Sequence, residues 1–348
     1  MNIIDVTTIK KILLIRRDNI GDIICTTPAI HALRKKFSQA RIDVLANSYN
    51  ADALANNPDV GTIYIYEKAK HFKNRNRLSV WLSNLKLIFK IRKQRYDVAI
   101  GCGSYSPRLE RYTFLTGAKV RIGYLKKNQK FSLYNKGIVS PSEHAHEVVK
   151  TFNLIRPLGI ETDPGGLILA PSSSEQSKFK DFKTASYANA GRPLVAVAIS
   201  ARIKKNKWPI EKFITLIEKL LAQNTVHVLL LWSPGSMNSS TFPGDDEAAD
   251  IIIRRFDGKV KGYPTSALRA LVAAISLSDV VISLDTGSLH IAAALQKPTV
   301  ALMTKGKAQS WHPWKTKSIV LESEDSVENI SVDDALDAVN MLAESCGQ

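Results

Sequence analysis

The chain has 348 residues, of which 48 are Lys or Arg and 32 are Asp or Glu, giving a net charge of +16. Its 45% apolar and 23% charged residues are typical of a globular protein and exclude a disordered or fibrous one. No apolar run approaches the roughly 20 residues that a bilayer span needs, and the first residues lead into a strand rather than a signal peptide, so we expect a cytoplasmic protein. Three widely spaced cysteines, Cys25, Cys102 and Cys346, exclude a CxxC metal site.

The excess positive charge lies in the first part of the chain. Residues 1–150 hold 27 Lys and Arg against 11 Asp and Glu, whereas residues 151–348 hold 21 of each. A basic half joined to a neutral half indicates that one domain meets an acidic partner or surface.

Strand and helix signals alternate along the whole chain, which predicts an α/β protein with two doubly wound, Rossmann-like domains. We expect the basic domain over 1–170, a polar linker over 171–192, a second domain over 193–330 and a last helix over 331–348. The predicted strands are 11–16, 42–46, 62–66, 97–102, 120–124, 194–199, 226–231, 280–284, 299–302 and 319–321. The predicted helices of the second half are 210–223, 245–256, 266–276, 288–296 and 332–344.

The turn after the first strand reads Arg16-Arg-Asp-Asn-Ile-Gly-Asp22, and a helix over 23–33 follows. Its single glycine excludes the G-x-G-x-x-G dinucleotide fingerprint, which disfavours a nicotinamide or flavin enzyme. Asp18 is placed like a turn or cap residue. Asp22, in the first helical turn, can point toward a ligand, or it can simply complement the helix dipole.

A second strand, turn and helix lie late in the chain, where Asp285-Thr-Gly287 joins the strand 280–284 to the helix 288–296. The N–H groups at the start of a helix attract an anion, and Gly287 has no side chain to block its approach. A diphosphate fits there. Asp285 can hold hydroxyls of a group attached to that diphosphate, as in a sugar nucleotide, or it can serve only as a helix cap.

These two motifs, the stretch Lys11 to Ile30 and the stretch Asp285 to Leu302, together resemble the bacterial ADP-heptose:lipopolysaccharide heptosyltransferases of glycosyltransferase family 9. The resemblance implies a GT-B fold, in which two domains face each other across a cleft and the last helix packs back on the first domain. It also implies that Asp22 is the catalytic base and that Arg16, matched to the family's basic residue at the end of the first strand, is a donor-binding residue.

The same resemblance assigns the donor-binding residues. Thr286 and Gly287 are expected to hold the diphosphate, and Asp285 the sugar hydroxyls. His290 belongs to the motif, although a packed helical histidine is an equally good interpretation.

The block Ser200 to Pro209 resembles the family's phosphate-binding stretch before Trp-Pro. The family places a lysine two residues before the tryptophan, where this chain has Asn206. Its neighbours Lys205 and Lys207 are therefore the candidates for neutralising the departing diphosphate, with a slight preference for Lys205. Ser200 can donate a hydroxyl to the same phosphates. The alternative for the lysines is a solvated loop.

The implied reaction is the inverting transfer of heptose from ADP-L-glycero-β-D-manno-heptose to the inner core of lipopolysaccharide. Lysines and a helix dipole can stabilise the diphosphate leaving group, and no Asp-x-Asp pair stands in a suitable loop, so we expect no metal cofactor. One alternative keeps the fold but uses another nucleotide sugar, or a capsule or protein acceptor. A non-catalytic alternative is a basic module that binds a membrane or nucleic acid.

The implied acceptor, the lipid A core, is acidic and membrane-anchored, which matches the basic half. In a predicted helix over 78–96, apolar residues recur at helical spacing among five cations, as in helices that lie on anionic membranes, although a core-packed helix has the same pattern. The loop 68–77 is a candidate for binding acceptor phosphates. We therefore expect peripheral association with the inner membrane and no nucleic-acid partner, and the sequence gives no indication of an oligomeric state.

Overall fold

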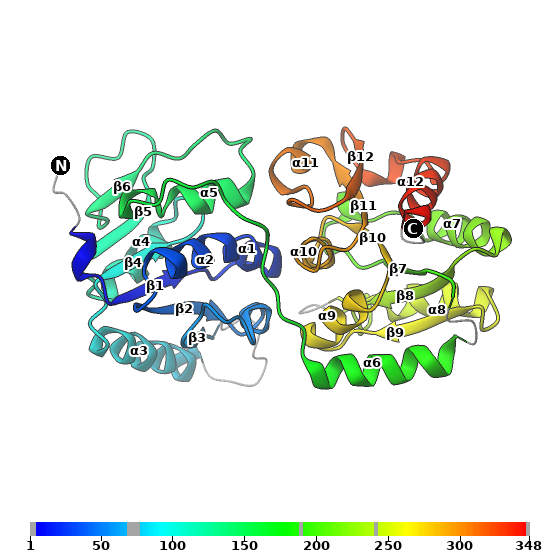
Figure 1. Cartoon of the computed structure of the whole chain (residues 1–348), viewed down its shortest axis with the longest axis horizontal. Helices are drawn as coiled ribbons and strands as arrows, with labels where there is room; N and C mark the ends of the chain where they lie inside the picture. Colours follow the sequence, from blue (N-terminus) through cyan, green and yellow to red (C-terminus); the bar gives the residue numbers. More distant parts are fainter. Residues whose placement is uncertain (1–4, 68–76, 188–190, 240–242, 346–348) are drawn as a thin grey trace. The chain divides into compact units, whose positions relative to one another are not determined.

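The computed structural model describes residues 5–67, 77–187, 191–239 and 243–345, and it divides into two compact units, Met1–Ala170 and Pro171–Gln348. Each unit contains one six-stranded sheet in which all neighbouring strands are parallel, flanked by helices (Figure 1). The predicted α/β class with two doubly wound domains is confirmed.

The first unit has the strand order β3-β2-β1-β4-β5-β6. Its strands are β1 (Lys11–Ile15), β2 (Arg41–Asn47), β3 (Ile63–Tyr66), β4 (Val98–Gly101), β5 (Val120–Tyr124) and β6 (Lys136–Ile138). Its helices are α1 (Ile20–Ile24), α2 (Thr27–Lys36), α3 (Arg77–Lys93), α4 (Pro107–Leu115) and α5 (Glu147–Asn153), with short 3₁₀ turns η1 (Val6–Thr8), η2 (Ala51–Leu54) and η4 (Arg156–Leu158).

The second unit repeats this arrangement, with the order β12-β11-β10-β7-β8-β9. Its strands are β7 (Leu194–Ala198), β8 (His227–Trp232), β9 (Val260–Pro264), β10 (Val280–Leu284), β11 (Thr299–Thr304) and β12 (Ser318–Ser323). Its helices are α6 (Ser173–Ser186), α7 (Ile210–Gln223), α8 (Asp246–Arg255), α9 (Leu268–Ser276), α10 (Gly287–Ala294), α11 (Lys305–Trp311) and α12 (Val332–Glu344), with 3₁₀ turns η5 (Lys204–Asn206) and η6 (Val327–Asn329).

The central strands are nearly continuous apolar runs because helices cover them on both faces. Every residue of β7 and β10 is buried, and so are four of the five residues of β1. Runs of this kind are typical of parallel strands. In each sheet the chain reverses its winding direction at the first strand, between β1 and β4 and between β7 and β10. Ligands of doubly wound sheets bind at the carboxyl ends of the strands at this point, so the fold selects two places for a site.

The helix predicted over 23–33 is two helices, α1 and α2, separated at Cys25 and Thr26. Pro28 stands in the first turn of α2, where its missing N–H leaves no hydrogen bond unmade. The hydroxyl of Thr26 donates to the carbonyl oxygen of Asp22 at 2.9 Å. The break therefore isolates α1 as a short segment that carries Asp22.

The segment 171–192 differs from the polar linker that we expected, since it contains helix α6, which packs on α9. Buried Phe179 is the reason, because its ring meets the ring of Tyr263 edge-on at 5.0 Å between centroids. The apolar face of the last helix, α12, packs on α7 and on the second sheet, within its own unit. Its contact with the first domain stays a prediction.

The packing of α12 can be tested with two neighbouring residues on this helix. Leu342 is buried in the second unit's core and Met341 is 65% exposed. Leu342→Ala is expected to lower the free energy of unfolding by about 2–5 kcal/mol through lost burial and a residual cavity. Met341→Ala is expected to change it by less than about 0.5 kcal/mol. Urea unfolding followed by circular dichroism measures both, and equal effects would contradict this placement of α12.

Candidate active site

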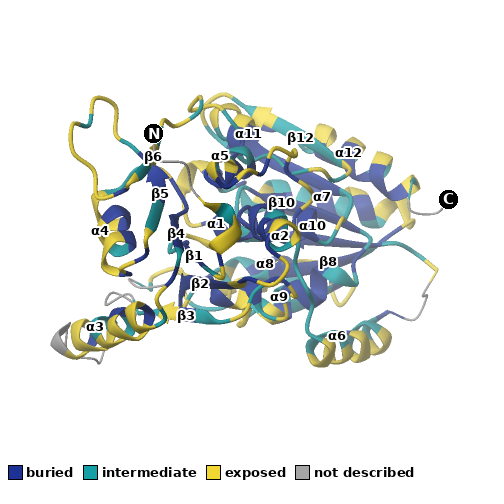
Figure 2. Ribbon diagram, turned by 60° about the vertical axis from the view of Figure 1, so that its left-hand side comes forward, coloured by how far each residue is buried: buried dark blue, intermediate teal, exposed yellow. Residues whose placement is uncertain are grey.

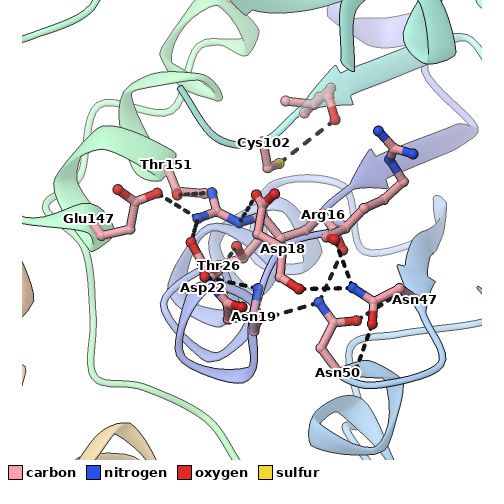
Figure 3. A network of polar contacts seen from close by, with 12 residues as sticks. Arg16, Asp18, Asn19, Asp22, Thr26, Asn47, Asn50, Cys102, Glu147 and Thr151 are labelled. Atoms are coloured by element: carbon pink, nitrogen blue, oxygen red, sulfur yellow. Dashed lines mark hydrogen bonds and ion pairs between the residues drawn. The ribbon is translucent and has the colours of Figure 1, made fainter. Parts of the chain in front are cut away.

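Arg16 is the centre of the polar cluster at the carboxyl end of β1. Its side chain is 1% exposed, and its Nη2 donates to Asp22 Oδ1 at 2.5 Å and to Glu147 Oε1 at 2.7 Å (Figure 3). Its Nε lies 3.4 Å from Asp18 Oδ2. Burial alone lowers the pKa of an arginine, but the three carboxylates outweigh it and hold the pKa of Arg16 well above its ordinary value. The guanidinium is therefore permanently charged.

Asp22 is held on both carboxylate oxygens but is not sealed from solvent. While Oδ1 accepts from Arg16, Oδ2 accepts from the backbone N–H of Asn19 at 3.0 Å, which fixes the start of α1. The side chain remains 12% exposed. Each carboxylate oxygen has a second lone pair, so Asp22 can still accept a proton from a molecule at this edge of the sheet.

Two buried asparagines at the end of β2 hold the loop that carries Asp18. The side-chain amide of Asn47 donates to the carbonyl oxygens of Arg17 and Asp18 at 2.7 and 2.8 Å. Asn50 donates in turn to the carbonyl oxygen of Arg16 at 3.4 Å. The turn that the sequence motif spans is thus fixed by residues from a neighbouring strand.

The end of β4 comes close to the same cluster at Gly103. Its φ of +126° is a conformation that side-chain-bearing residues rarely adopt. A Cβ at this position would lie 3.2 Å from Asp18 Oδ2 and 3.5 Å from Arg16 Nη1. Because Gly103 has no side chain, the segment that follows β4 can approach the Arg16 cluster.

In the second unit, the equivalent position at the end of β10 holds Asp285, Thr286 and Gly287, all half-buried. Gly287 is the first residue of α10, so the first N–H groups of that helix have no partner within the helix. The hydroxyl of Ser288 lies 2.7 Å from that of Ser283 and 2.8 Å from that of Thr286, which orders this turn. The starts of helices attract anions in general, and binding of a diphosphate at this turn stays a prediction.

Asn206 links the other predicted block to this turn. Its side-chain amide donates to Asp285 Oδ2 at 3.0 Å, and the residue is only 2% exposed. Its Oδ1 is buried with no hydrogen-bond partner among the described residues. At the position where the family has a lysine, this chain therefore has a neutral amide that is hydrogen-bonded to the Asp285 carboxylate.

The neighbouring predicted residues have different surroundings. Lys205 is exposed, whereas Lys207 is half-buried, with its Nζ 3.1 Å from Asp245 Oδ1. Ser200, at the end of β7, accepts a hydrogen bond from the N–H of Ser233 at 2.8 Å, which leaves its own hydrogen to donate. Their contacts with a donor remain predictions.

His290 lies on the buried side of α10 at 3% exposure, and its ring packs edge-on against Trp311 at 5.7 Å between centroids. This surrounding matches the packing interpretation, while a role in binding stays a prediction. Arg16 is also predicted to bind the donor. Its side chain pairs with three carboxylates of the first unit, and its contact with a donor stays a prediction.

Glu147, Asn47 and Asn50 were not predicted from the sequence. Glu147 is separated from Arg16 by more than a hundred residues and stands in no recognisable motif. A signal was available for Asn47 and Asn50, because they follow the predicted strand 42–46 and ligands of parallel sheets bind at the carboxyl ends of strands. Within the parts of the chain that the structure describes, no group of three or more His, Cys, Asp or Glu side chains is arranged to hold a metal ion.

Cys25 and Cys102 are both buried, and the charged groups of the Arg16 cluster affect the pKa of each thiol. Burial raises the pKa of Cys25 well above its ordinary value, and the carboxylates of Glu147 and Asp22 raise it further. Burial raises the pKa of Cys102 to about 12. In a Cys346→Ser variant at pH 8, we expect Ellman's reagent to modify neither thiol in the native state and both in guanidinium chloride. Reaction of either thiol in the folded protein would contradict this.

The same shifts predict an alkaline loss of stability. An unfolded thiol ionises near pH 9, the ordinary value, whereas folded Cys102 ionises near pH 12. The unfolded state therefore binds fewer protons over this range, so this contribution is complete below pH 9 and falls as the pH rises toward 12. We expect the urea concentration at the midpoint of unfolding to fall as the pH rises from 9 toward 12. Cys102→Ala is expected to weaken this dependence on pH.

Comparisons with known proteins give the family and the fold of this chain. A family model described as glycosyltransferase family 9 (heptosyltransferase) matches residues 84–336. Lipopolysaccharide heptosyltransferase 3 of Escherichia coli is 22% identical over 86% of this chain and 85% of its own length.

Two solved structures share the fold. The glycosyl transferase family 9 structure from Veillonella parvula matches with a TM-score of 0.82 and 18% identity over 97% of each chain. E. coli ADP-heptose lps heptosyltransferase II matches with a TM-score of 0.76 and 21% identity over 96% of this chain and 99% of its own. Because the family model covers well over half of the sequence, the chain belongs to glycosyltransferase family 9.

Proposed function

We propose that this family 9 glycosyltransferase transfers heptose from ADP-L-glycero-β-D-manno-heptose to the inner core of lipopolysaccharide, with inversion at the anomeric carbon. The observation that carries the proposal is the placing of Asp22, a carboxylate anchored on a buried arginine yet 12% exposed, where the winding of the first sheet reverses. The names of the relatives support the choice of donor and acceptor.

The step requires a base for the acceptor hydroxyl. As the acceptor oxygen forms its bond to the anomeric carbon, its proton passes to the Asp22 carboxylate, and the bond from that carbon to the diphosphate oxygen breaks. A single displacement of this kind inverts the configuration. Arg16 and the N–H of Asn19 keep the carboxylate oriented, since they hold one oxygen each.

The departing ADP needs stabilisation of its growing negative charge. In the proposal the diphosphate binds at the start of α10, held by Thr286 and by the backbone N–H group of Gly287, and Lys205 or Lys207 adds positive charge. Asp285, steadied by Asn206, binds sugar hydroxyls. The proposal requires both units to act on one donor molecule, and it includes no metal ion.

The role of Asp22 is tested by Asp22→Asn, with transfer measured in EDTA using ADP-heptose and a Kdo-lipid A acceptor. The amide cannot accept the proton, so we expect kcat to fall about a hundredfold or more. Arg16 keeps Glu147 and Asp18 as partners, so the variant is expected to fold and to bind the donor with unchanged affinity in calorimetry.

The matched control is Asp52→Asn, which removes an exposed carboxylate in the first turn of η2. Its kcat should match that of the unmodified chain. Full activity of Asp22→Asn would rule out Asp22 as the base and would favour a non-catalytic binding module.

The surface of α3 supports an acidic, membrane-anchored acceptor. The helix buries Val80, Ile88 and Ile91 and leaves a stripe at helical spacing exposed: Leu82, Lys86, Phe89 and Lys93 (Figure 2). Exposed apolar residues between lysines suit the headgroup region of an anionic leaflet. No helix within the described residues is long and apolar enough to cross a membrane. The loop 68–77, our candidate for acceptor phosphates, lies outside the described residues except for Arg77.

Membrane contact through α3 is tested by Phe89→Asp in co-sedimentation with phosphatidylglycerol vesicles. Phe89 is 62% exposed, so its loss is expected to leave the fold intact and to weaken binding about tenfold, the value of one buried aromatic ring. Ile251→Asp, an exposed apolar position on α8, is the control and should bind as the unmodified chain does. Equal binding by both variants would exclude α3 as the contact.

A further inference from the structure

Glu147 faces Asp22 across a single guanidinium nitrogen. Both carboxylates accept from Arg16 Nη2, Asp22 at 2.5 Å and Glu147 at 2.7 Å (Figure 3). Glu147 is the first residue of α5, where a helix start favours a negative charge, and it is 5% exposed. The next turn of α5 supplies Thr151, whose hydroxyl accepts from Arg16 Nη1 at 3.5 Å.

The cluster carries more negative than positive charge. Asp18, Asp22 and Glu147 surround Arg16, and the partly buried guanidinium of Arg17 interacts with Asp18 from the same loop. The five groups therefore sum to one negative charge when all are ionised. The other titratable groups that face it are Cys25 from the end of α1, Cys102 from the end of β4 and Tyr124 from β5, and all three stay protonated and neutral because burial raises the pKa of each. His146, the N-cap of α5, accepts a hydrogen bond at Nδ1 from Val148, so that nitrogen carries no proton.

This charge excess bears on how well Asp22 can accept a proton. A carboxylate paired alone with an arginine holds its proton weakly, which suits an ion pair and not a general base. A second carboxylate on the same nitrogen draws away part of the arginine's stabilisation and adds its own repulsion. Both effects raise the proton affinity of Asp22.

We propose that Glu147 is a positioning residue that shares Arg16 with Asp22 and so keeps the Asp22 carboxylate basic enough to accept the acceptor's proton. The inference rests on the proposed function for the use that it gives to Asp22. The charge relation between the two carboxylates can be measured without any substrate.

The test is a carbon-13 NMR titration of the chain labelled at aspartate carboxyl carbons, with the Asp22 signal assigned by its loss in Asp22→Asn. Glu147→Gln keeps a hydrogen-bond acceptor for Arg16 and removes the charge. We expect the pKa of Asp22 to fall by about one unit in this variant. Glu147→Asp, which restores the charge, should return it toward the original value. Kinetics should show the acidic limb of the kcat/KM profile moving to lower pH by the same amount.

The matched control is Glu110→Gln. Glu110 is also a buried glutamate of the first unit, at 6% exposure, but its carboxylate accepts from Ser132 and from the N–H of Leu133 rather than from Arg16. A general effect of removing a buried charge would shift Asp22 in both variants, and that result would overturn the proposal. The predicted result is a shift in Glu147→Gln alone.

Asp18→Asn keeps the proposal testable if Glu147→Gln does not fold. The Asp18 side chain is 55% exposed, so its substitution is tolerated, and it should lower the pKa of Asp22 in the same direction by a smaller amount. An unchanged Asp22 titration in the folded variant overturns the inference. If Asp22→Asn has nevertheless lost transfer, the proposed function stands; if Asp22→Asn is active, the proposed function fails whatever the titration shows.

Discussion

The structure of the first unit depends on one buried positive charge. A guanidinium taken out of water is tolerated only when it is paired, and removing a partner from such a group costs about 3–5 kcal/mol. Arg16 meets this requirement with carboxylates from three segments: the loop after β1, helix α1 and helix α5. The need to neutralise one side chain thus fixes where α1 and α5 begin, and with them the orientation of Asp22.

The second unit has a different set of polar contacts at the reversal point of its sheet. It has no buried cation at the end of β7 or β10 among the described residues, and its turn is ordered by hydroxyls and by the amide of Asn206. A neutral partner leaves the charge of Asp285 uncompensated by that contact, whereas a lysine there would form an ion pair. The two units therefore share a topology and differ in the groups at the reversal point, where the first unit has a buried cluster of charges and the second a hydrogen-bonded turn beside Asp285.

The sequence predicted the parts of this structure that rest on local patterns. All ten predicted strands lie within two residues of the observed bounds at both ends, because buried parallel strands are apolar throughout. The edge strands β6 and β9 were missed, since Lys136–Ile138 has three residues and Val260–Pro264 contains Lys, Gly and Pro, which edges tolerate and centres do not. Helix α6 was taken for a linker because few of its residues are apolar.

The candidate site was predictable only where it is contiguous in sequence. Asp22 and the turn at Gly287 each lie within a strand, turn and helix motif, so their positions follow from the topology. The role of Glu147 and the contact between Asn206 and Asp285 could not be found in this way, because each depends on one contact between residues 131 or 79 positions apart. Contacts of this kind arise from tertiary packing and leave no periodic signal.

The most direct measurement is a crystal structure of this chain with a non-transferable ADP-heptose analogue. The account predicts that the diphosphate oxygens contact Thr286 and lie within hydrogen-bond distance of the backbone N–H group of Gly287, that Asp285 contacts sugar hydroxyls, and that the Asp22 carboxylate faces the anomeric carbon from the side opposite the diphosphate. A donor bound away from the start of α10, or an anomeric carbon that Asp22 cannot approach, would contradict it.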